Sequence, residues 1–349
     1  MKIRINMLSK AESVKGQGVA SAYREQISLI SELDDTFAME INSKSNDFDI
    51  FHIHSPNLRF KLRMNKKHLN IVHVHFVPSK NDGSLRLPKL INYIFNKYVE
   101  SLYRKADELV VVNPCFFSDL EKLKINRNNI TYIPNYVSKS GFYPLPDDRT
   151  RSIKDELCLP KDKFIVLGCG QIQTRKGFDD FVETAQKNPD MEFIWAGGFS
   201  FGRLMHGYRK YKKLLKNLPQ NMHHLGIIDR DKMNDIFNIS DVLFMPSYME
   251  LFPMTILEMC NLHKPFLVRD LELYRPILFS KYCVGKNIQD FSLELQKLRD
   301  NATYYSTQCD NSKFISEFYN KDTMLKTWKD YYLRVYDKWN SKLESKKIK

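Results

Sequence analysis

The feature that most constrains the fold is an alternation of short apolar segments with helical patterns, present in both halves of the 349-residue chain. Such alternation is typical of parallel sheets covered by helices. A chain of this length can form two domains with sizeable cores. We therefore predict an α/β protein with two Rossmann-like, parallel-sheet domains. In the second half, the expected strands span residues 164–167, 192–196, 224–225, 241–245 and 265–268.

The expected boundary between the domains lies near residue 150. Residues 138–161 are polar and contain three prolines and a glycine, a composition typical of an interdomain linker. The first domain should therefore comprise residues 1–150 and the second residues 151–320. Residues 321–349 form a third segment, which we expect to be a helix with a frayed basic tail. Its apolar stripe is expected to pack in a core and contains Trp328, Tyr332, Val335 and Trp339.

Two glutamates stand at a predicted strand-to-helix junction, within the segment SYMELFPMTILEM at residues 247–259. Pro253 is a favoured residue at a helix start, and the first amides of a helix are free to bind a phosphate. Glu250 would lie in the loop and Glu258 in the helix, so one carboxylate can reach the sugar side of a diphosphate and the other the ribose side. The amides that could meet the phosphate are those of Met254, Thr255 and Ile256.

Two glycine-containing loops are the other candidates for a phosphate site. The segment GCGQIQTRKG, at residues 168–177, follows a predicted strand and contains Arg175 and Lys176, which can form charge-assisted bonds to a diphosphate. Near the amino terminus, Gly16 and Gly18 follow the first predicted strand, and glycine lets a backbone approach a ligand closely. Taken alone, each loop also fits a simple turn or a solvated basic pair.

Histidines occur as two pairs with alternate spacing, His52 with His54 and His73 with His75. Alternate residues of a strand share one face. Paired histidines can bind zinc, but no acidic or cysteine partner with clear spacing accompanies them, so we expect no metal. Two Asp-x-Asp sequences, at residues 47–49 and 229–231, lack the setting of a metal-diphosphate site.

The motifs together resemble the GT-B, family 4 retaining glycosyltransferases, whose signature is a glutamate, seven residues and a second glutamate. The resemblance implies that Glu250 contacts the transferred sugar and that Glu258 holds the ribose. It also places Lys176 at the diphosphate and His75 at the donor sugar, as the active-site histidine. Many members carry an arginine where this chain has Gln171, so Arg175 is a candidate for that role.

Within this family, residues 1–26 resemble most closely the bacterial synthases that add a second sugar to monoglycosyl-diacylglycerol. The resemblance implies transfer of glucose or galactose from a UDP-sugar to a glycolipid, with retention and without a cofactor or metal. It also implies that the carboxyl-terminal helix returns to the first domain. Two alternatives stay open: a capsule or wall polysaccharide as acceptor, and a catalytically idle adapter. The sequence decides neither the sugar nor the linkage.

The charge balance indicates an acidic partner, because 54 Lys and Arg against 41 Asp and Glu give a formal net charge of +13. An amphipathic pattern near residues 89–105 fits either a helix in an anionic membrane interface or a helix packed on the first sheet. No nucleic-acid motif is present, so we expect no nucleic-acid partner. The residues expected at the membrane are Arg59, Lys61, Arg63, Lys66, Lys67, Lys89 and Lys97.

The expected location is the cytoplasmic face of the cell membrane. The six cysteines are scattered without CxxC pairs, and the amino terminus lacks a long apolar stretch. No apolar run is long enough to span a bilayer. We therefore expect a peripheral protein, with an anionic lipid as a possible activator.

Overall fold

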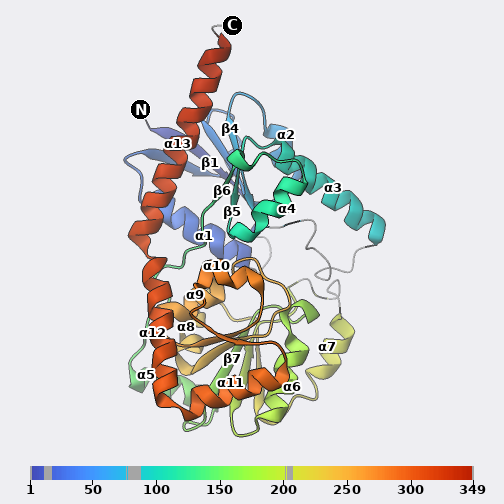
Figure 1. Cartoon of the computed structure of the whole chain (residues 1–349), viewed down its shortest axis with the longest axis vertical. Helices are drawn as coiled ribbons and strands as arrows, with labels where there is room; N and C mark the ends of the chain where they lie inside the picture. Colours follow the sequence, from blue (N-terminus) through green and yellow to red (C-terminus); the bar gives the residue numbers. More distant parts are fainter. Residues whose placement is uncertain are drawn as a thin grey trace.

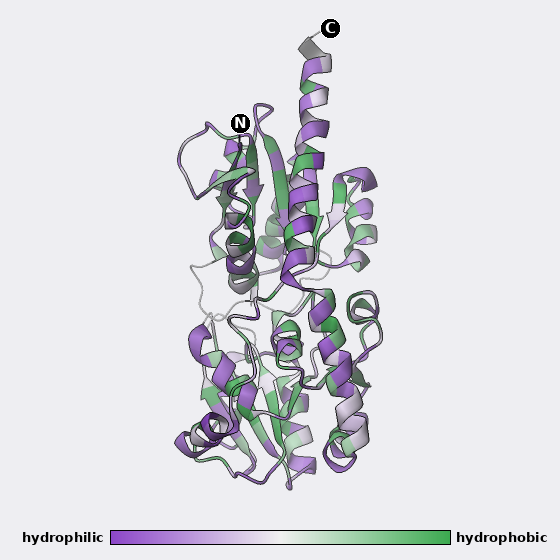
Figure 2. Ribbon diagram, turned by 90° about the vertical axis from the view of Figure 1, so that its left-hand side faces the viewer, coloured by the Kyte–Doolittle hydropathy of each residue, from purple (hydrophilic) through white to green (hydrophobic). Residues whose placement is uncertain are grey.

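The computed structural model describes residues 2–11, 18–75, 77, 88–200, 202 and 207–347. The chain forms two α/β lobes, one above the other in Figure 1, each built on a six-stranded parallel sheet. Short apolar runs form the buried strands, and helices cover the sheet faces (Figure 2). The predicted α/β class with two Rossmann-like domains is confirmed.

The first domain has the strand order β2-β1-β3-β4-β5-β6. The order reverses at β1, and ligands of open α/β sheets bind beyond the carboxyl ends of the strands at such a point. Its strands are β1 (Ile3–Leu8), β2 (Phe37–Ile41), β3 (Ile50–Ile53), β4 (Leu69–Val74), β5 (Glu108–Val111) and β6 (Ile130–Tyr132). Its main helices are α1 (Gly18–Ser31), α2 (Leu58–Arg63), α3 (Lys89–Lys105) and α4 (Phe117–Lys122).

The second domain has the strand order β12-β11-β10-β7-β8-β9, so its sheet also reverses, here at β7. Its strands are β7 (Ile165–Cys169), β8 (Glu192–Ala196), β9 (Met222–Gly226), β10 (Val242–Met245), β11 (Phe266–Arg269) and β12 (Cys283–Gly285). Its helices are α5 (Asp147–Glu156), α6 (Phe178–Lys187), α7 (Tyr208–Leu214), α8 (Arg230–Ile239), α9 (Met254–Asn261), α10 (Arg275–Leu278), α11 (Ile288–Asp300) and α12 (Ala302–Phe318).

The linker leads directly into α5, which packs against α8 of the second domain. Arg149 of α5 donates to the Asp235 carboxylate at 3.0 Å. Residue 150 therefore lies inside a helix of the second domain, and that domain begins at the start of α5. The predicted linker, residues 138–161, thus contains a helix, and the residue just before it is tied to α9, because Asn261 Nδ2 donates to the carbonyl of Val137 at 3.1 Å.

The carboxyl-terminal helix α13 (Lys321–Lys347) runs back along the first domain, and its end projects beyond that domain in Figure 1. Its buried side chains join the core formed by β1, β3, β4 and α1. Tyr332 hydrogen-bonds to His52 Nδ1 at 2.6 Å, and Lys338 pairs with Glu108 at 2.6 Å. The helix thereby closes one face of the first sheet.

Candidate active site

A cavity of about 560 Å³ opens between the two domains, beyond the carboxyl ends of the central strands. Its walls come from both sheets, so neither domain forms the site alone. The position fits the rule that ligands of α/β sheets bind where the strand order reverses. The predicted site residues that line it are Gly18, His75, Arg175, Lys176, Glu250, Met254, Thr255 and Glu258. Gly16 lies outside the described residues.

The loop between β7 and α6 brings a lysine onto the first glutamate. Gly177 has φ +68°, and a Cβ there would lie 2.2 Å from the carbonyl oxygen of Pro246. Only glycine permits this close approach, which holds the loop against the segment that follows β10. As a result, Lys176 Nζ lies 2.5 Å from Glu250 Oε1, and Arg175 Nη1 donates to the carbonyl of Met249 at 3.2 Å.

Glu250 is buried and Lys176 is partly buried, and the surroundings shift both pKa values. Burial alone would raise the pKa of Glu250, but the charges of Lys176 and Arg175 outweigh it, and the net pKa is lowered. Burial, assisted by Arg175, lowers the pKa of Lys176 despite the opposing effect of Glu250. The pair thus presents an ammonium to the cavity and keeps the carboxylate ionised.

The amino end of α9 supplies two of the three predicted amides. Its cap residue, Pro253, makes no side-chain cap hydrogen bond, and Met254 and Thr255 line the cavity. Ile256 differs from the prediction, because its N–H donates to the carbonyl of Pro253 at 3.3 Å. Its side chain is buried and does not line the cavity. A tight first turn thus removes one amide from the candidate phosphate site.

The second glutamate is held by an arginine that bridges the domains. Arg230 Nη1 lies 2.6 Å from Glu258 Oε1, while Arg230 Nη2 lies 3.0 Å from Glu25 Oε1 on α1 of the first domain. Burial raises the pKa of Glu258, and the Arg230 charge opposes that rise. The sequence analysis missed Arg230 because it considered only the two aspartates of the Asp229–Asp231 segment. The position of Arg230 between these two aspartates was the signal in the sequence that could have identified it.

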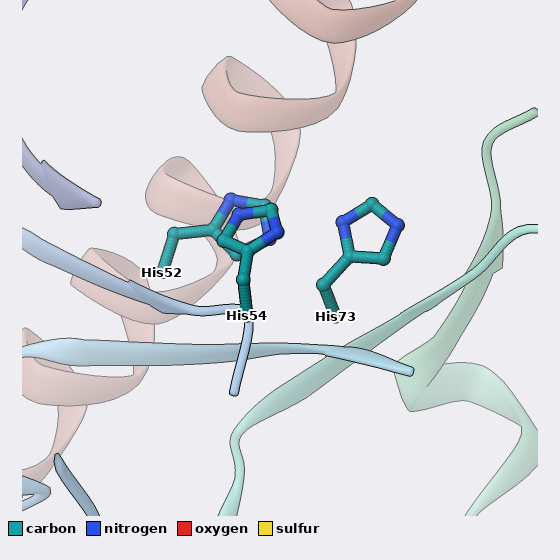
Figure 3. Close-up of side chains that lie close together, drawn as sticks. All are labelled: His52, His54 and His73. Atoms are coloured by element: carbon teal, nitrogen blue, oxygen red, sulfur yellow. The ribbon is translucent and has the colours of Figure 1, made fainter. Parts of the chain in front are cut away.

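The four paired histidines gather on one face of β3 and β4, beside the cavity. Only His75 of these lines the cavity, and its Nε2 lies 3.2 Å from His54 Nδ1. Burial lowers the pKa of His75 to about 4, so the imidazole is neutral at pH 7. The ring of His75 stacks on that of His73, with centroids 4.3 Å apart. Figure 3 shows the other three, His52, His54 and His73, close together.

The basic residues expected at a membrane fall into two groups. Three of them interact with other protein groups. Lys61 donates to Ser101 on α3, and Arg63 donates to the carbonyls of Ser43 and Ser45. Lys97 pairs with Glu100 on the same helix. Arg63 therefore fixes a loop of its own domain. The other four side chains are exposed, and they are Arg59, Lys66, Lys67 and Lys89.

The amphipathic helix α3 packs on the first domain in its second half and exposes apolar side chains in its first half. In its second half, Val99, Leu102 and Tyr103 are buried against the first domain. In its first half, Leu90, Ile91, Tyr93 and Ile94 are between 51% and 69% exposed. The adjacent helix α2 likewise exposes Leu58 and Leu62. Among the described residues, no helix combines the length and apolar character needed to cross a bilayer.

Two protein-family models match the chain, one in each domain. The model described as "Glycosyltransferase Family 4" matches residues 29–140, and that described as "Glycosyl transferases group 1" matches residues 149–309. The first match ends at residue 140 and the second begins at residue 149, so the break between them lies within residues 138–161.

Two curated proteins resemble the chain over most of its length. An alpha-galactosylglucosyldiacylglycerol synthase of Streptococcus pneumoniae is 38% identical over 95% of this chain and 89% of its own. A processive diacylglycerol alpha-glucosyltransferase of Acholeplasma laidlawii is 26% identical over 83% of this chain and 86% of its own.

Two solved structures share the fold. Sucrose-phosphate synthase from Thermosynechococcus elongatus superposes with a TM-score of 0.78 at 14% identity, covering 96% of this chain and all of its own. Anabaena HepE in complex with UDP-glucose superposes with a TM-score of 0.75 at 12% identity, covering 95% of this chain and all of its own.

Proposed function

This chain belongs to the GT-B, family 4 glycosyltransferases, and we propose that it transfers glucose or galactose from a UDP-sugar to monoglycosyl-diacylglycerol. The product would be a diglycosyl-diacylglycerol. The observation that carries this proposal is the 38% identity, over 95% of the chain, to a synthase of a glycolipid of that kind. The cavity of about 560 Å³ between the domains supports the proposal, because it is lined by residues of both domains and is of a size typical of ligand sites.

We infer that the leaving diphosphate meets the positive groups of the second domain. Lys176 and Arg175 lie on one wall of the cavity, and the free amides of Met254 and Thr255 lie at the amino end of α9. Charge that develops on the diphosphate would be stabilised by these preorganised donors, with no metal required for that task.

We propose that Glu250 orients the sugar. Its carboxylate is buried, ionised and fixed by Lys176, so it can accept hydrogen bonds from sugar hydroxyls and stabilise positive charge near the reacting carbon. His75 would contact the same sugar from the first domain. No side chain stands out as a dedicated base, and we propose that the departing phosphate takes the acceptor proton, with retention of configuration.

Glu258 is the proposed ribose ligand. In the structure its carboxylate is engaged by Arg230, so ribose hydroxyls must either share that carboxylate or displace the guanidinium. A carboxylate has two oxygens and about four acceptor sites, which allows sharing. Donor binding is thereby linked to the bridge between Arg230 and Glu25 of the first domain.

We propose that the exposed parts of α2 and α3 dock on an anionic membrane at the cytoplasmic leaflet. The two helices lie together, because Lys105 Nζ of α3 donates to the carbonyl of Lys61 at 2.9 Å. Exposed leucine, isoleucine and tyrosine side chains on these helices can enter the interface, while the exposed basic residues around them meet lipid phosphates. An anionic lipid would then raise activity by recruiting the enzyme.

The test is a product assay with purified protein. UDP-glucose or UDP-galactose is incubated with mixed micelles of monoglucosyl-diacylglycerol and an anionic lipid, and lipid products are analysed by mass spectrometry. A glycolipid one hexose heavier supports the proposal and identifies the donor. UDP release without a lipid product would assign the enzyme to another acceptor, such as a polysaccharide, and would overturn it.

A matched pair of variants ties the product to the cavity. Glu250→Gln removes the charge beside Lys176 and should abolish transfer. Glu183→Gln makes the same change on the outer face of α6, where the carboxylate pairs only weakly with Lys187 at 3.5 Å, and should leave transfer intact.

A further inference from the structure

We propose that His52, His54 and His73 form a buried structural site for a zinc-class divalent cation, directly behind the active-site histidine. One ring nitrogen from each residue lies within 4.8 Å of the other two, and all three residues are buried. The three residues do not line the donor cavity, and the proposed ion takes no part in the bonds made or broken in transfer. It therefore goes beyond the proposed function and does not depend on it.

The parallel pairing of two strands brings the three residues together. Residue His52 of β3 lies opposite Ile71 of β4, so His54 and His73, each two residues further along, share the same face. Trp328 of α13 packs over this face, with its ring centre 5.8 Å from that of His52 and 6.0 Å from that of His73. Figure 3 shows the three rings grouped in front of this helix.

The observation that points to a ligand is a set of four unpartnered nitrogens. Within the described part of the chain, His52 Nε2, His54 Nε2 and both ring nitrogens of His73 are buried without a hydrogen-bond partner. Each such buried polar atom destabilises the fold unless it gains a partner. One cation bound by the three imidazoles would provide partners for three of these four atoms.

The outer nitrogens of two rings are already fixed in the way that metal-binding histidines require. His52 Nδ1 lies 2.6 Å from the Tyr332 hydroxyl oxygen. That hydroxyl can donate its own proton to Met7 Sδ at 3.9 Å, and its oxygen accepts from the Gln26 amide. In that network His52 carries its proton on Nδ1, and the lone pair of Nε2 faces the cluster. Such second-shell bonds fix the tautomer of ligating histidines.

The geometry needs only a small adjustment. A tetrahedral zinc ion with Zn–N bonds of about 2.0–2.1 Å holds its ligand nitrogens about 3.3 Å apart. The ring nitrogens now lie up to 4.8 Å apart, so the longest of these separations would shorten by about 1.5 Å when zinc binds. Rotations of the rings about the side-chain bonds can supply this change. Three imidazoles would leave the fourth position of the ion to a water molecule.

The ion also has a consequence for His75. When His54 binds the cation through Nε2, its proton resides on Nδ1, which then donates to His75 Nε2 at 3.2 Å. His75 is left with its own proton on Nδ1. The cation would thus determine the tautomer of the histidine that lines the donor cavity.

The sequence analysis expected no metal because it treated each histidine pair alone. In the structure, the His52 and His54 pair lies beside the pair of His73 and His75. Because α2 and the loops beside it separate the two strands along the chain, the spacing of the residues does not show this neighbourhood.

The first experiment measures zinc bound to the whole chain, purified without a histidine tag, supplied with excess Zn²⁺ and passed through gel filtration. We expect zinc at a concentration equal to that of the chain, and a Tm that rises with zinc. His73→Asn should lose both effects. His263→Asn makes the same change in the second domain, where φ is +55° and asparagine is well tolerated, and should retain both.

Co²⁺ provides a test that requires no variant. A four-coordinate site should give Co²⁺ the intense visible absorption of that geometry, and added Zn²⁺ should remove it. This result supports the proposal even if His73→Asn fails to fold. Wild-type protein without bound zinc and without this absorption would overturn the proposal and indicate a cluster that holds only water. Zinc retained equally by a folded His73→Asn chain would also overturn it.

Discussion

Membrane docking by α2 and α3 is open to a quantitative test, because the structure gives the exposure of the side chains that would enter the lipid. Leu62 on α2 is 72% exposed and Ile94 on α3 is 58% exposed. Full burial of a leucine or isoleucine side chain stabilises by about 1.5–3 kcal/mol. Scaled by their exposed fractions, the two residues would contribute roughly 2–4 kcal/mol together on insertion.

The perturbation is the double substitution Leu62→Ser with Ile94→Ser. Since 1.4 kcal/mol corresponds to a tenfold change, partition onto vesicles should fall by roughly 30- to 700-fold. Sedimentation with vesicles rich in an anionic phospholipid measures this directly. Both side chains are already exposed, so the free energy of unfolding should change little.

The matched control is Leu293→Ser on α11 of the second domain, where the leucine is 57% exposed. It removes one leucine of comparable exposure, far from α2 and α3, and should leave vesicle binding intact. Binding by the double variant within about threefold of wild type, well below the roughly 30-fold minimum, would refute insertion of these helices. Equal losses in the control and the double variant would instead indicate a general effect of surface hydrophobicity.

Three further outcomes follow from the site geometry. Burial lowers the pKa of Lys176, and a lysine loses its charge as pH rises, so kcat/KM should decline at a lower pH than it would with an ordinary lysine. Lys176→Arg should abolish that decline in whatever activity remains. An unchanged pH profile in this variant would exclude Lys176 as the origin of the decline. Gly197→Ala should destabilise the fold by about 3 kcal/mol or more, because φ is +139° and the new Cβ would lie 1.9 Å from a backbone oxygen. Urea unfolding should show this loss of stability. The control Gly141→Ala should show no such loss, because the nearest atom to its new Cβ lies 3.8 Å away. Arg230→Gln should cost about 3 kcal/mol of stability, because it leaves the buried Glu258 carboxylate without its charged partner. The same substitution should alter KM for the UDP-sugar more than kcat. An unchanged KM in steady-state kinetics would contradict the link between Arg230 and donor binding.

Local patterns in the sequence predicted the strands that line the cavity and the loops between strand and helix. Each of these motifs lies within one segment, so alternation and turn residues are sufficient signals. The strands β2 and β12 were not predicted; both are edge strands and contain exposed residues. Ile256 was misplaced because a helix-start rule supplies free amides, whereas the actual first turn uses one of them.

Interactions between distant segments were beyond sequence reasoning. Arg63 reads as one more positive charge in a basic stretch, yet its guanidinium binds carbonyls of the loop before β3. The two histidine pairs look alike in sequence, and only the β3–β4 pairing shows that they form one cluster. In each case the deciding partner lies on another strand or loop, and charge or spacing along the chain does not indicate it.

Arg230 shows why such partners matter for function. Glu258 and Glu25 belong to different domains, and one guanidinium holds both carboxylates. A ribose that takes over part of the Glu258 carboxylate weakens one half of this bridge and leaves Arg230 more available to Glu25. With Glu258 as the proposed ribose ligand, binding of the donor and the contact between the domains would depend on the same carboxylate, and a ligand that favours one arrangement would shift the other by the same free energy. The bridge is consequently the point in the described structure at which occupancy of the nucleotide site can be communicated to α1 and the acceptor side of the cavity.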